Sequence, residues 1–368
     1  MKIVSVRNSK TLKKFIQLPF LIYKDTPQWI PPLNSMIKNV IKKGSPFLDV
    51  DREFFLVMDG PQPVARAGVF LNSKVLEQVG KRGGFTLFEA FDSDEAVDLL
   101  IRRMDRWFKE RSILEYLGPD SPTNGDDFKG VLVDNFNDPP YINMNYNMPY
   151  YFKLLEKAGF QIFRRYAAFR YDLTKEIPER YVKLIEAAKR RYGIKVVSPD
   201  FKNIKKITAD ILTVIESSIP EDWIGVRPPT YQQMLGIVKE LKRFADPDLV
   251  ALAYHDGKPV GISAAMPNYN EILKELNGKL YPFGWLKFLA EKNRIKSFRL
   301  FVVYVAREFQ KKGVSFAMHY HIGKNAMKKG YREAEGSIIG FDNKRSFQDA
   351  AGAGGEVYKE YDYLIRRL

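Results

Sequence analysis

The sequence of 368 residues has no cysteine and only three histidines, His255, His319 and His321. Without cysteine the chain forms no disulfide, no thiolate metal site and no cysteine nucleophile. His319 and His321 are two residues apart in a segment expected to be helical, so their side chains point to different faces and cannot chelate one metal together. We therefore expect no metal site and a chemistry that uses other groups.

The sequence also lacks a long apolar run. No stretch approaches the roughly 18 to 20 apolar residues that cross a bilayer as a helix, and the N-terminal segment MKIVSVRNSKTLKKF has no apolar signal core. Hydrophobic residues make up 45% of the chain and charged residues 28%, which is typical of a globular protein with a polar surface. These features predict a cytoplasmic protein without a membrane span.

Acidic residues are fewer than basic ones, 44 against 59, so the formal net charge is +15. A basic surface attracts polyanions, which raises nucleic acid or an anionic cofactor as partners. The basic residues are scattered, however, and the densest segments, such as 187–195, lack the interleaved aromatic and glycine residues of an RNA-binding sheet. Nucleic-acid binding therefore rests on net charge alone, and we keep it only as a lesser alternative.

A repeated pattern divides the chain into two halves. Residues 54–71 and 249–266 each predict a β-hairpin with Asp-Gly at the turn and Pro-Val at the start of the second strand. In both halves a strand, a helix, a strand, a helix and a strand follow, so a duplicated α/β unit is the simplest explanation. We place an N-terminal domain at 1–175, a helical linker at 176–190 and a C-terminal domain at 191–368.

The most informative segment is 302–331, a β-rich stretch followed by a glycine-containing loop and a helix. Such a loop presents unpaired backbone N–H groups and the positive end of the helix dipole, which together bind a diphosphate. The segment resembles the N-acetyltransferase (GNAT) superfamily, whose pyrophosphate loop reads Q/R-x-x-G-x-G/A. The matching residues are Gln310, Lys311, Lys312, Gly313, Val314 and Ser315, with Ser315 in place of the usual glycine or alanine.

This resemblance implies an α/β protein with a mixed sheet, built from two tandem acyl-CoA N-acyltransferase (GNAT-like) folds, with acetyl-CoA or another acyl-CoA as cofactor. It also implies that the strand backbone at Val303, Tyr304 and Val305 contacts the thioester end of the cofactor, where N–H groups polarise the carbonyl. Asn343, which precedes the next predicted helix, is similar to the asparagine that contacts the pantetheine arm in the superfamily.

The usual general acid of the superfamily, a tyrosine in the helix after that asparagine, is absent. The corresponding residue is Ala350. Asp349 is the catalytic candidate nearest in sequence, and Tyr358 and Tyr361 are alternatives for the acid. The candidate general bases are Glu221, Asp222, Glu335 and Asp349.

The N-terminal half differs where a cofactor would bind. Its corresponding loop, 92–96, contains three carboxylates and no glycine, and such a loop repels a pyrophosphate. We interpret this half as a copy that kept the fold and lost the cofactor. The segments 117–151 and 266–285 resemble a group of uncharacterised bacterial tandem acetyltransferase-like proteins, and this resemblance covers nearly the whole chain.

The long irregular segment 118–151 is rich in hydrogen-bonding and aromatic side chains. Loops of this length in a compact domain are usually functional or disordered, and the tyrosines argue against disorder. We expect four of its residues to line a pocket for a polar, cationic substrate between the two domains: Asn124, Asp126, Tyr146 and Asn147. The alternative is that the proline, asparagine and aspartate residues only build turns.

These observations predict an enzyme that transfers an acyl group from acyl-CoA to the amine of a small or amino-acid-like molecule. The alternative is a non-catalytic protein that binds or senses acyl-CoA, an interpretation that Ala350 favours. The acceptor, the acyl chain length and the oligomeric state are not specified by any of these patterns.

Overall fold

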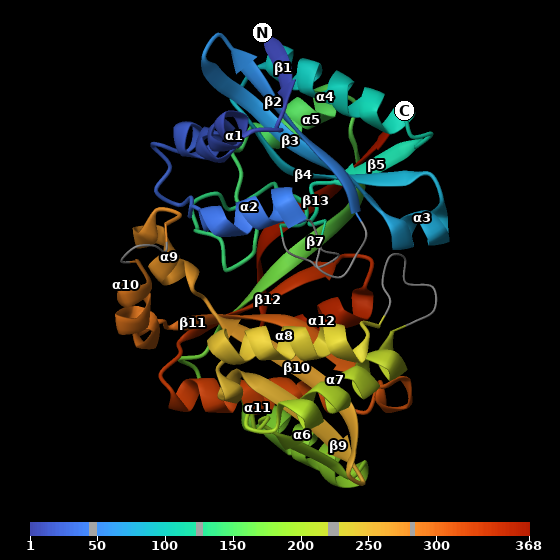
Figure 1. The fold of residues 1–368 in the computed structure, drawn as a ribbon. Helices are drawn as coiled ribbons and strands as arrows, with labels where there is room; N and C mark the ends of the chain where they lie inside the picture. The colour runs from blue at the N-terminus through green and yellow to red at the C-terminus, as the bar shows by residue number, and fades with distance from the viewer. Residues whose placement is uncertain (44–49, 123–127, 220–227, 280–283) are drawn as a thin grey trace.

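The structure is a computed structural model that describes residues 1–43, 50–122, 128–219, 228–279 and 284–368 (Figure 1). The N-terminal half contains twelve helices and strands within these ranges: β1 (Lys2–Ser5), α1 (Ser9–Ile22), α2 (Asn34–Lys43), β2 (Val50–Asp59), β3 (Gln62–Asn72), α3 (Ser73–Val79), β4 (Arg82–Ala90), α4 (Asp94–Lys109), β5 (Glu115–Gly118), β6 (Val131–Leu132), α5 (Tyr151–Lys157) and β7 (Gln161–Asp172).

The second half begins with α6 (Glu179–Arg191), at the place of the expected linker, and this helix packs against α11 and β8. The elements that follow are β8 (Ile194–Val197), α7 (Ile204–Ser218), α8 (Tyr231–Phe244), η1 (Pro247–Leu249), β9 (Val250–His255), β10 (Lys258–Pro267), α9 (Asn270–Leu276), α10 (Gly284–Glu291), η2 (Lys292–Arg294), β11 (Ser297–Val305), η3 (Arg307–Phe309), α11 (Val314–Lys328), β12 (Glu333–Gly340), α12 (Lys344–Gly352) and β13 (Glu356–Arg367).

The two halves place their side chains on the sheet in the same way. Because successive strand residues face opposite sides, Phe55 and Val57 of β2 pack in the core that includes α4, while Phe54 and Leu56 pack against α1. In the second half, Ala251 and Ala253 of β9 face α11, while the intervening Leu252 packs with Val214 of α7. Each half therefore has its own core on both faces of its strands, as the duplicated pattern predicts.

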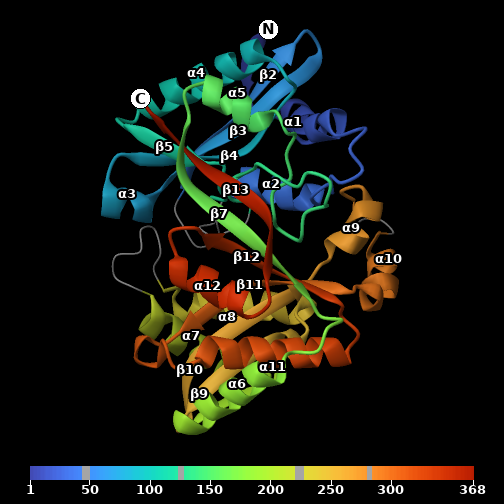
Figure 2. The same cartoon turned by 180° about the vertical axis from the view of Figure 1, so that it is seen from behind.

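The last strands of the two halves are exchanged. The strands of the described residues form one sheet in the order β1-β2-β3-β4-β5-β13-β7-β12-β11-β10-β9-β8, and β6 pairs with β13. The C-terminal strand β13 therefore lies between β5 and β7 of the first half, and β7 lies between β13 and β12. Figures 1 and 2 show β7 and β13 side by side through the middle of the molecule. The two halves are thus joined by backbone hydrogen bonds, and the sequence pattern had not predicted this.

In both halves the fourth and fifth strands of the unit pair only at their beginnings. β4 and β5 are parallel over Arg82–Gly84, and β11 and β12 are parallel over Ser297–Leu300. Beyond these positions the strands diverge, which opens a gap in the sheet in each half. Within the described residues, no helix is both long and apolar enough to span a membrane.

Candidate functional site

The N-terminus of α11 has the features of an anion site. Its N-cap is Gly313, in the left-handed region with φ 77°, and among the described residues no side chain caps the helix. Its first turn carries no carboxylate. The N–H groups of the first turn have no intrahelical acceptors and lie at the positive end of the helix dipole. This is the position of the predicted loop Gln310–Ser315, so the local structure fits a diphosphate.

Glycine is required at this N-cap for two reasons. A side chain disfavours φ 77°, and a Cβ at Gly313 would lie 3.2 Å from the Cβ of Ala188 on α6. Lys312 holds its amino group 4.8 Å from the centre of the Phe309 ring, so one positive charge is fixed beside the loop. The helix that the sequence assigns to a linker thus forms one wall of this site.

The gap between β11 and β12 lies next to this helix N-terminus. Beyond Leu300, β11 pairs with β10 only, so one edge of Val302–Val305 faces the gap. A β-bulge interrupts the pairing with β10 at Phe301, whereas Tyr304 and Val305 pair regularly with Ile262 and Gly261. The bulge arises because the register with β10 slips between Ala264 and Ala265.

The equivalent gap in the N-terminal half is closed by two tyrosines. The hydroxyl of Tyr150 donates to the carbonyl of Ala90 at 3.0 Å, and the hydroxyl of Tyr151 accepts from the N–H of Ala90 at 3.0 Å. The following helix α4 is capped by Ser93 and begins with Asp94 and Glu95. Side chains thus occupy the strand backbone and the helix N-terminus of this half. In the second half, Gln310 Nε2 donates to the carbonyl of Val305 at 3.3 Å, whereas among the described residues no side chain caps α11.

The residues predicted around α12 have structural partners. The side chain of Asn343 accepts from the N–H of Ser346 at 3.2 Å and caps α12. Asp349 forms an i,i+4 ion pair with Arg345 at 3.9 Å on a half-exposed helix face. Ala350, at the position of the usual tyrosine acid, packs in a small cluster with Ala167 and Phe169. Four predicted residues lie outside the described residues: Asn124, Asp126, Glu221 and Asp222.

A buried group of charged and hydroxyl side chains lies where β11 and β12 diverge. We call Arg299, Glu335, Ser337, Tyr358 and Lys359 the central cluster. The carboxylate of Glu335 accepts from Ser337 Oγ at 2.5 Å and from the hydroxyl of Tyr358, and it lies 3.7 Å from Arg299. Lys359 donates to the carbonyl of Asp138 at 2.7 Å. This cluster links strands of both halves to the long loop.

Burial shifts the pKa values of Glu335, Tyr358 and Lys359 in the direction of their neutral forms. It raises the pKa of Glu335, whose residue is 0% exposed, although Arg299 and the hydrogen bonds from Ser337 and Tyr358 act in the opposite direction. Burial also lowers the pKa of Lys359 to about 8. Glu335 was one of several candidate bases in the sequence, and its complete burial distinguishes it from the half-exposed Asp349.

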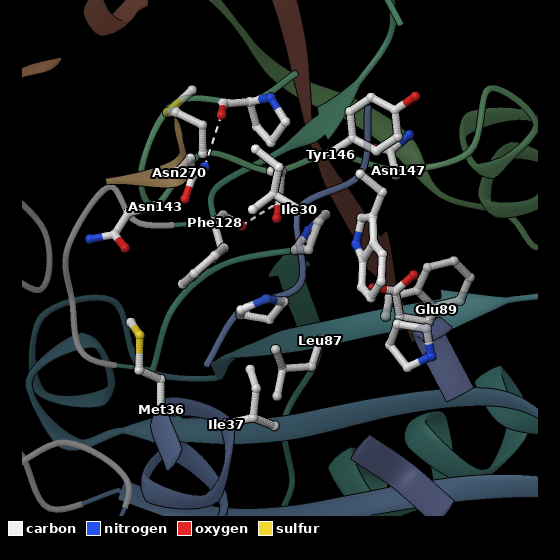
Figure 3. A pocket seen from close by; sticks show the side chains of 18 of the residues that line it. Ile30, Met36, Ile37, Leu87, Glu89, Phe128, Asn143, Tyr146, Asn147 and Asn270 are labelled. Carbon is white, nitrogen blue, oxygen red and sulfur yellow. Dashed lines mark hydrogen bonds between the residues drawn. The ribbon is translucent and has the colours of Figure 1, made fainter. Parts of the chain in front are cut away.

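A pocket with a cavity of about 100 Å³ lies between α1, α2, β4, the long loop and α9 (Figure 3). Its lining is mostly apolar and includes Ile30, Met36, Ile37, Leu87, Phe128 and Leu273. Tyr146 and Asn147, two of the predicted substrate residues, also line it. The amide of Asn147 is already bonded to both backbone groups of Leu132, at 2.7 and 3.1 Å, so it shapes the wall of the pocket.

A buried glutamate lies at one side of this pocket. Glu89 accepts from the hydroxyls of Tyr23 at 2.6 Å and Tyr151 at 2.7 Å, and Arg66 lies 3.7 Å away. Burial raises the pKa of Glu89, and Arg66 and the two tyrosines oppose this shift. We did not identify Glu89 from the sequence, where the signal was a single carboxylate inside the apolar strand GFTLFEAF.

One short segment separates the pocket from the central cluster. Ile142 and Met144 line the pocket. On the other side, Arg299 donates to the carbonyl of Ile142 at 3.0 Å, and Ser337 Oγ lies 3.4 Å from the sulfur of Met144. The pocket and the buried groups at the strand gap are therefore neighbours, although they belong to different halves of the fold.

A second, wholly apolar cavity of about 40 Å³ lies between the sheet and the α7–α8 pair. It extends to Phe301, the bulged residue of β11, and its other lining residues include Ile211, Leu241, Leu252, Ile262 and Ala264. The cavity thus begins at the strand that borders the gap and continues beneath the helices.

Comparison with solved structures identifies the class of fold. A tandem GNAT protein from the clavulanic acid biosynthesis pathway aligns with 100% of this chain and 98% of its own, with a TM-score of 0.59 and 10% identity. A GCN5-related N-acetyltransferase from Sphaerobacter thermophilus aligns with 99% of this chain and 95% of its own, with a TM-score of 0.56 and 14% identity. The chain therefore has the tandem GNAT fold, and the expected fold class is confirmed.

Two named proteins are similar to this chain in sequence. The bacterial ceramide synthase of Caulobacter vibrioides is 27% identical over 100% of this chain and 98% of its own length. Protein YghO of Escherichia coli is 27% identical over 77% of this chain and 72% of its own length. No model of a known protein family matches the sequence.

Proposed function

We propose that this protein is an N-acyltransferase that moves an acyl group from acyl-CoA, bound in the C-terminal half, to an amine bound between the halves. The observation that carries the proposal is the uncapped, carboxylate-free N-terminus of α11 at Gly313, beside the gap between β11 and β12. In the N-terminal half, the side chains of Tyr150 and Tyr151 close the strand gap, and Ser93 caps the corresponding helix α4. This difference supports a single donor site. We place the reaction in the cytoplasm, where acyl-CoA is available.

The donor is held by backbone groups and small side chains. Gln310 to Ser315 bind the diphosphate through N–H groups and the positive charges of Lys311 and Lys312. The edge of β11 at Val303 and Val305 and the polar end of α12 at Asn343 border the path of the pantetheine arm. The apolar cavity beginning at Phe301 receives the first methylene groups of an acyl chain longer than acetyl.

The acceptor is proposed to be an amine with a hydrocarbon portion. Ceramides are long-chain amino alcohols acylated on nitrogen, and a relative of this chain is named a bacterial ceramide synthase. The pocket in Figure 3 suits such a molecule, because its lining is mostly apolar and also contains polar side chains, among them Glu89 and Asn143. This proposal changes the small, polar acceptor expected from the long loop into an amphipathic one.

The reaction requires the movement of protons at the strand gap. The amine nitrogen forms a bond to the thioester carbon, the carbon–sulfur bond breaks, the amine loses one proton and the departing sulfur gains one. Glu335, with its raised pKa, is the proposed acceptor of the amine proton. Tyr358, hydrogen-bonded to Glu335, is the proposed donor to sulfur in place of the residue lost at Ala350.

Binding without catalysis is the second candidate. Ala350 supports it, because its methyl group packs with Ala167 and Phe169, and it provides no acid at the superfamily's usual position. In that case the protein would hold acyl-CoA and leave the thioester intact. The two candidates agree on the donor site and differ only in turnover.

Calorimetric titration with acetyl-CoA and a long-chain acyl-CoA tests the donor site. Gly313→Glu adds a carboxylate to the diphosphate loop and is expected to weaken binding by more than about tenfold, or ~1.4 kcal/mol. Gly257→Glu is the matched control, because Gly257 also has φ 77° and has open space around it in the β9–β10 turn. Equal affinity of both variants would rule out this donor site.

Product analysis then separates enzyme from binding protein. Purified protein is incubated with acyl-CoA and long-chain amines, and N-acylated product and free thiol are measured together. Glu335→Gln and Tyr358→Phe are expected to lower kcat while donor affinity stays unchanged. Donor binding with no amide product and no thiol release for any amine would favour the non-catalytic function.

A further inference from the structure

The helix α10 turns a row of large apolar side chains outward. Trp285, Leu286 and Leu289 are 41%, 50% and 51% exposed. Their spacing places them on one face of the helix. On the opposite side, the ring of Phe288 lies 5.0 Å from that of Tyr269, and Lys287 pairs with Glu275 of α9. The helix is therefore attached by one face, and we call the outward set Trp285, Leu286 and Leu289 the α10 face.

Exposed basic side chains occur on the segments that precede and follow α10. The exposed ones from α9 to the start of β11 are Lys274, Lys279, Lys292, Arg294 and Lys296. The acidic residues of the same segment are Glu271, Glu275 and Glu291. Glu275 pairs with Lys287, and Glu271 accepts from the N–H of Ser297 at 3.0 Å. The surroundings of the apolar face thus have an excess of positive charge, which matches an anionic surface.

The α10 face lies beside the pocket proposed for the acceptor. The neighbouring helix α9 lines that pocket through Asn270 and Leu273, and α2 lines it through Met36, which is 37% exposed. The N–H of Asn34 donates to the carbonyl of Gly278 at 2.9 Å and joins α2 to the end of α9. Figure 1 shows α9 and α10 together at the edge of the molecule, next to α2.

We propose that the α10 face docks this protein on an anionic lipid bilayer, with its pocket next to the membrane surface. The proposal rests on the proposed function only for the idea that the acceptor is a lipid. Tryptophan and leucine on one side of a helix, with lysine and arginine at the flanks, are typical of helices that lie in the headgroup region. A protein partner is less suitable, because lysine is depleted in protein interfaces.

Cosedimentation with vesicles tests this docking. The full chain is mixed with vesicles of phosphatidylcholine alone or of an equimolar mixture of phosphatidylcholine and phosphatidylglycerol. We expect binding to the anionic vesicles that weakens as salt increases. The double variant Trp285→Ser, Leu289→Ser is expected to reduce binding by at least about tenfold, because it removes most of the apolar face.

Two controls make the result specific. Leu184→Ser removes a side chain that is 66% exposed on α6 and should leave vesicle binding unchanged. Gly313→Glu, which addresses the donor site, should also leave it unchanged, so a failure of the proposed function is distinguishable from a failure of docking. Lys292→Gln combined with Arg294→Gln is expected to weaken binding and to reduce its dependence on salt.

Three outcomes would overturn the proposal. The first is that the full chain binds neither kind of vesicle. The second is that the double variant binds anionic vesicles as well as the unchanged protein. The third is that sedimentation velocity without lipid shows a dimer that the double variant abolishes, in which case the α10 face is an interface between two copies of the chain.

Discussion

The hydroxyl of Tyr151 donates to the carboxylate of Glu89 at 2.7 Å and accepts from the backbone N–H of Ala90 at 3.0 Å. This one side chain therefore ties α5 to β4 at the place where the second half keeps its strand gap open. It also borders the pocket that lies between the halves. The closure of one gap and the shape of the pocket thus depend on the same residue.

Tyr151→Phe is expected to destabilise the protein by about 1–3 kcal/mol, because it leaves a buried N–H and part of a buried carboxylate without a hydrogen bond. Urea denaturation measures the change in the free energy of unfolding. Tyr231→Phe is the control, since Tyr231 is 38% exposed and such surface changes stay within about 0.5 kcal/mol. Equal stability of the two variants would mean that the contact contributes nothing.

The pH dependence of stability tests the environment of Glu335. Burial raises the pKa of Glu335 in the folded protein. At a pH below the pKa of this group in the unfolded chain, the carboxyl is protonated in both states and does not change the free energy of unfolding. As the pH rises from the unfolded to the folded pKa, only the unfolded state releases the proton. The free energy of unfolding therefore falls across this window and is constant above it.

Glu335→Gln removes this titration while keeping an oxygen that accepts from Tyr358. The stability of the variant relative to the unchanged protein should therefore rise across the same window, as measured by denaturation at a series of pH values. Glu89 titrates in both proteins and cancels in the difference. Glu308→Gln, at an exposed position, controls for the loss of one carboxylate. A difference that falls with pH would contradict a raised pKa.

Much of the fold was predictable from sequence because its signals are local. The Asp-Gly hairpins, the glycine loop before α11 and the apolar periodicity of α4 each depend on neighbouring residues, and the structure has all three. The short strand β1 and the helix α3 were not predicted, since each is too brief for a clear period. The exchange of β7 and β13 was not predicted either. The alternation of apolar and polar residues predicts that a segment is a strand, but it does not predict which strand it pairs with.

The candidate site was predictable only in part, for a related reason. The donor loop is contiguous, so its glycine and lysine residues could be read together. The central cluster combines Arg299, Glu335 and Tyr358 from three strands, and the order of strands in the sheet brings them together. Their sequence signal is weak, since a polar residue in a strand does not itself show whether its side chain is buried.

Filling the apolar cavity tests its assignment to the acyl chain. A cavity of about 40 Å³ has room for about three water-sized groups. Ala264→Leu adds bulk there and is expected to lower kcat/KM for longer acyl-CoA donors by about tenfold or more relative to acetyl-CoA, with ~1–3 kcal/mol of lost stability. Competition between donors of different length measures the ratio.

Ala253→Leu is the control for this variant, because Ala253 is 0% exposed on the opposite face of the same strands, against α11. It should cost similar stability and leave the donor preference unchanged. An unchanged preference in Ala264→Leu would exclude this cavity as the acyl site.

Separating the chain between β7 and α6 tests the exchange of strands and the predicted boundary at residue 175. In a fragment of residues 1–175, β7 and β5 both lose β13, and β7 also loses β12. These edges would expose unpaired backbone groups and apolar side chains. We therefore expect neither 1–175 nor 176–368 to fold alone, whereas the two fragments produced together form a stable complex.

Amide hydrogen exchange and thermal denaturation provide the measurements. In the intact chain the shared sheet predicts one cooperative unfolding transition, because the loss of β13 opens both halves at once. In the complex of fragments, protection of β7 amides should appear only when both pieces are present. Fragment 1–175 with native-like protection on its own would show that the N-terminal half is an independent folding unit, since its strands would not need the C-terminal one.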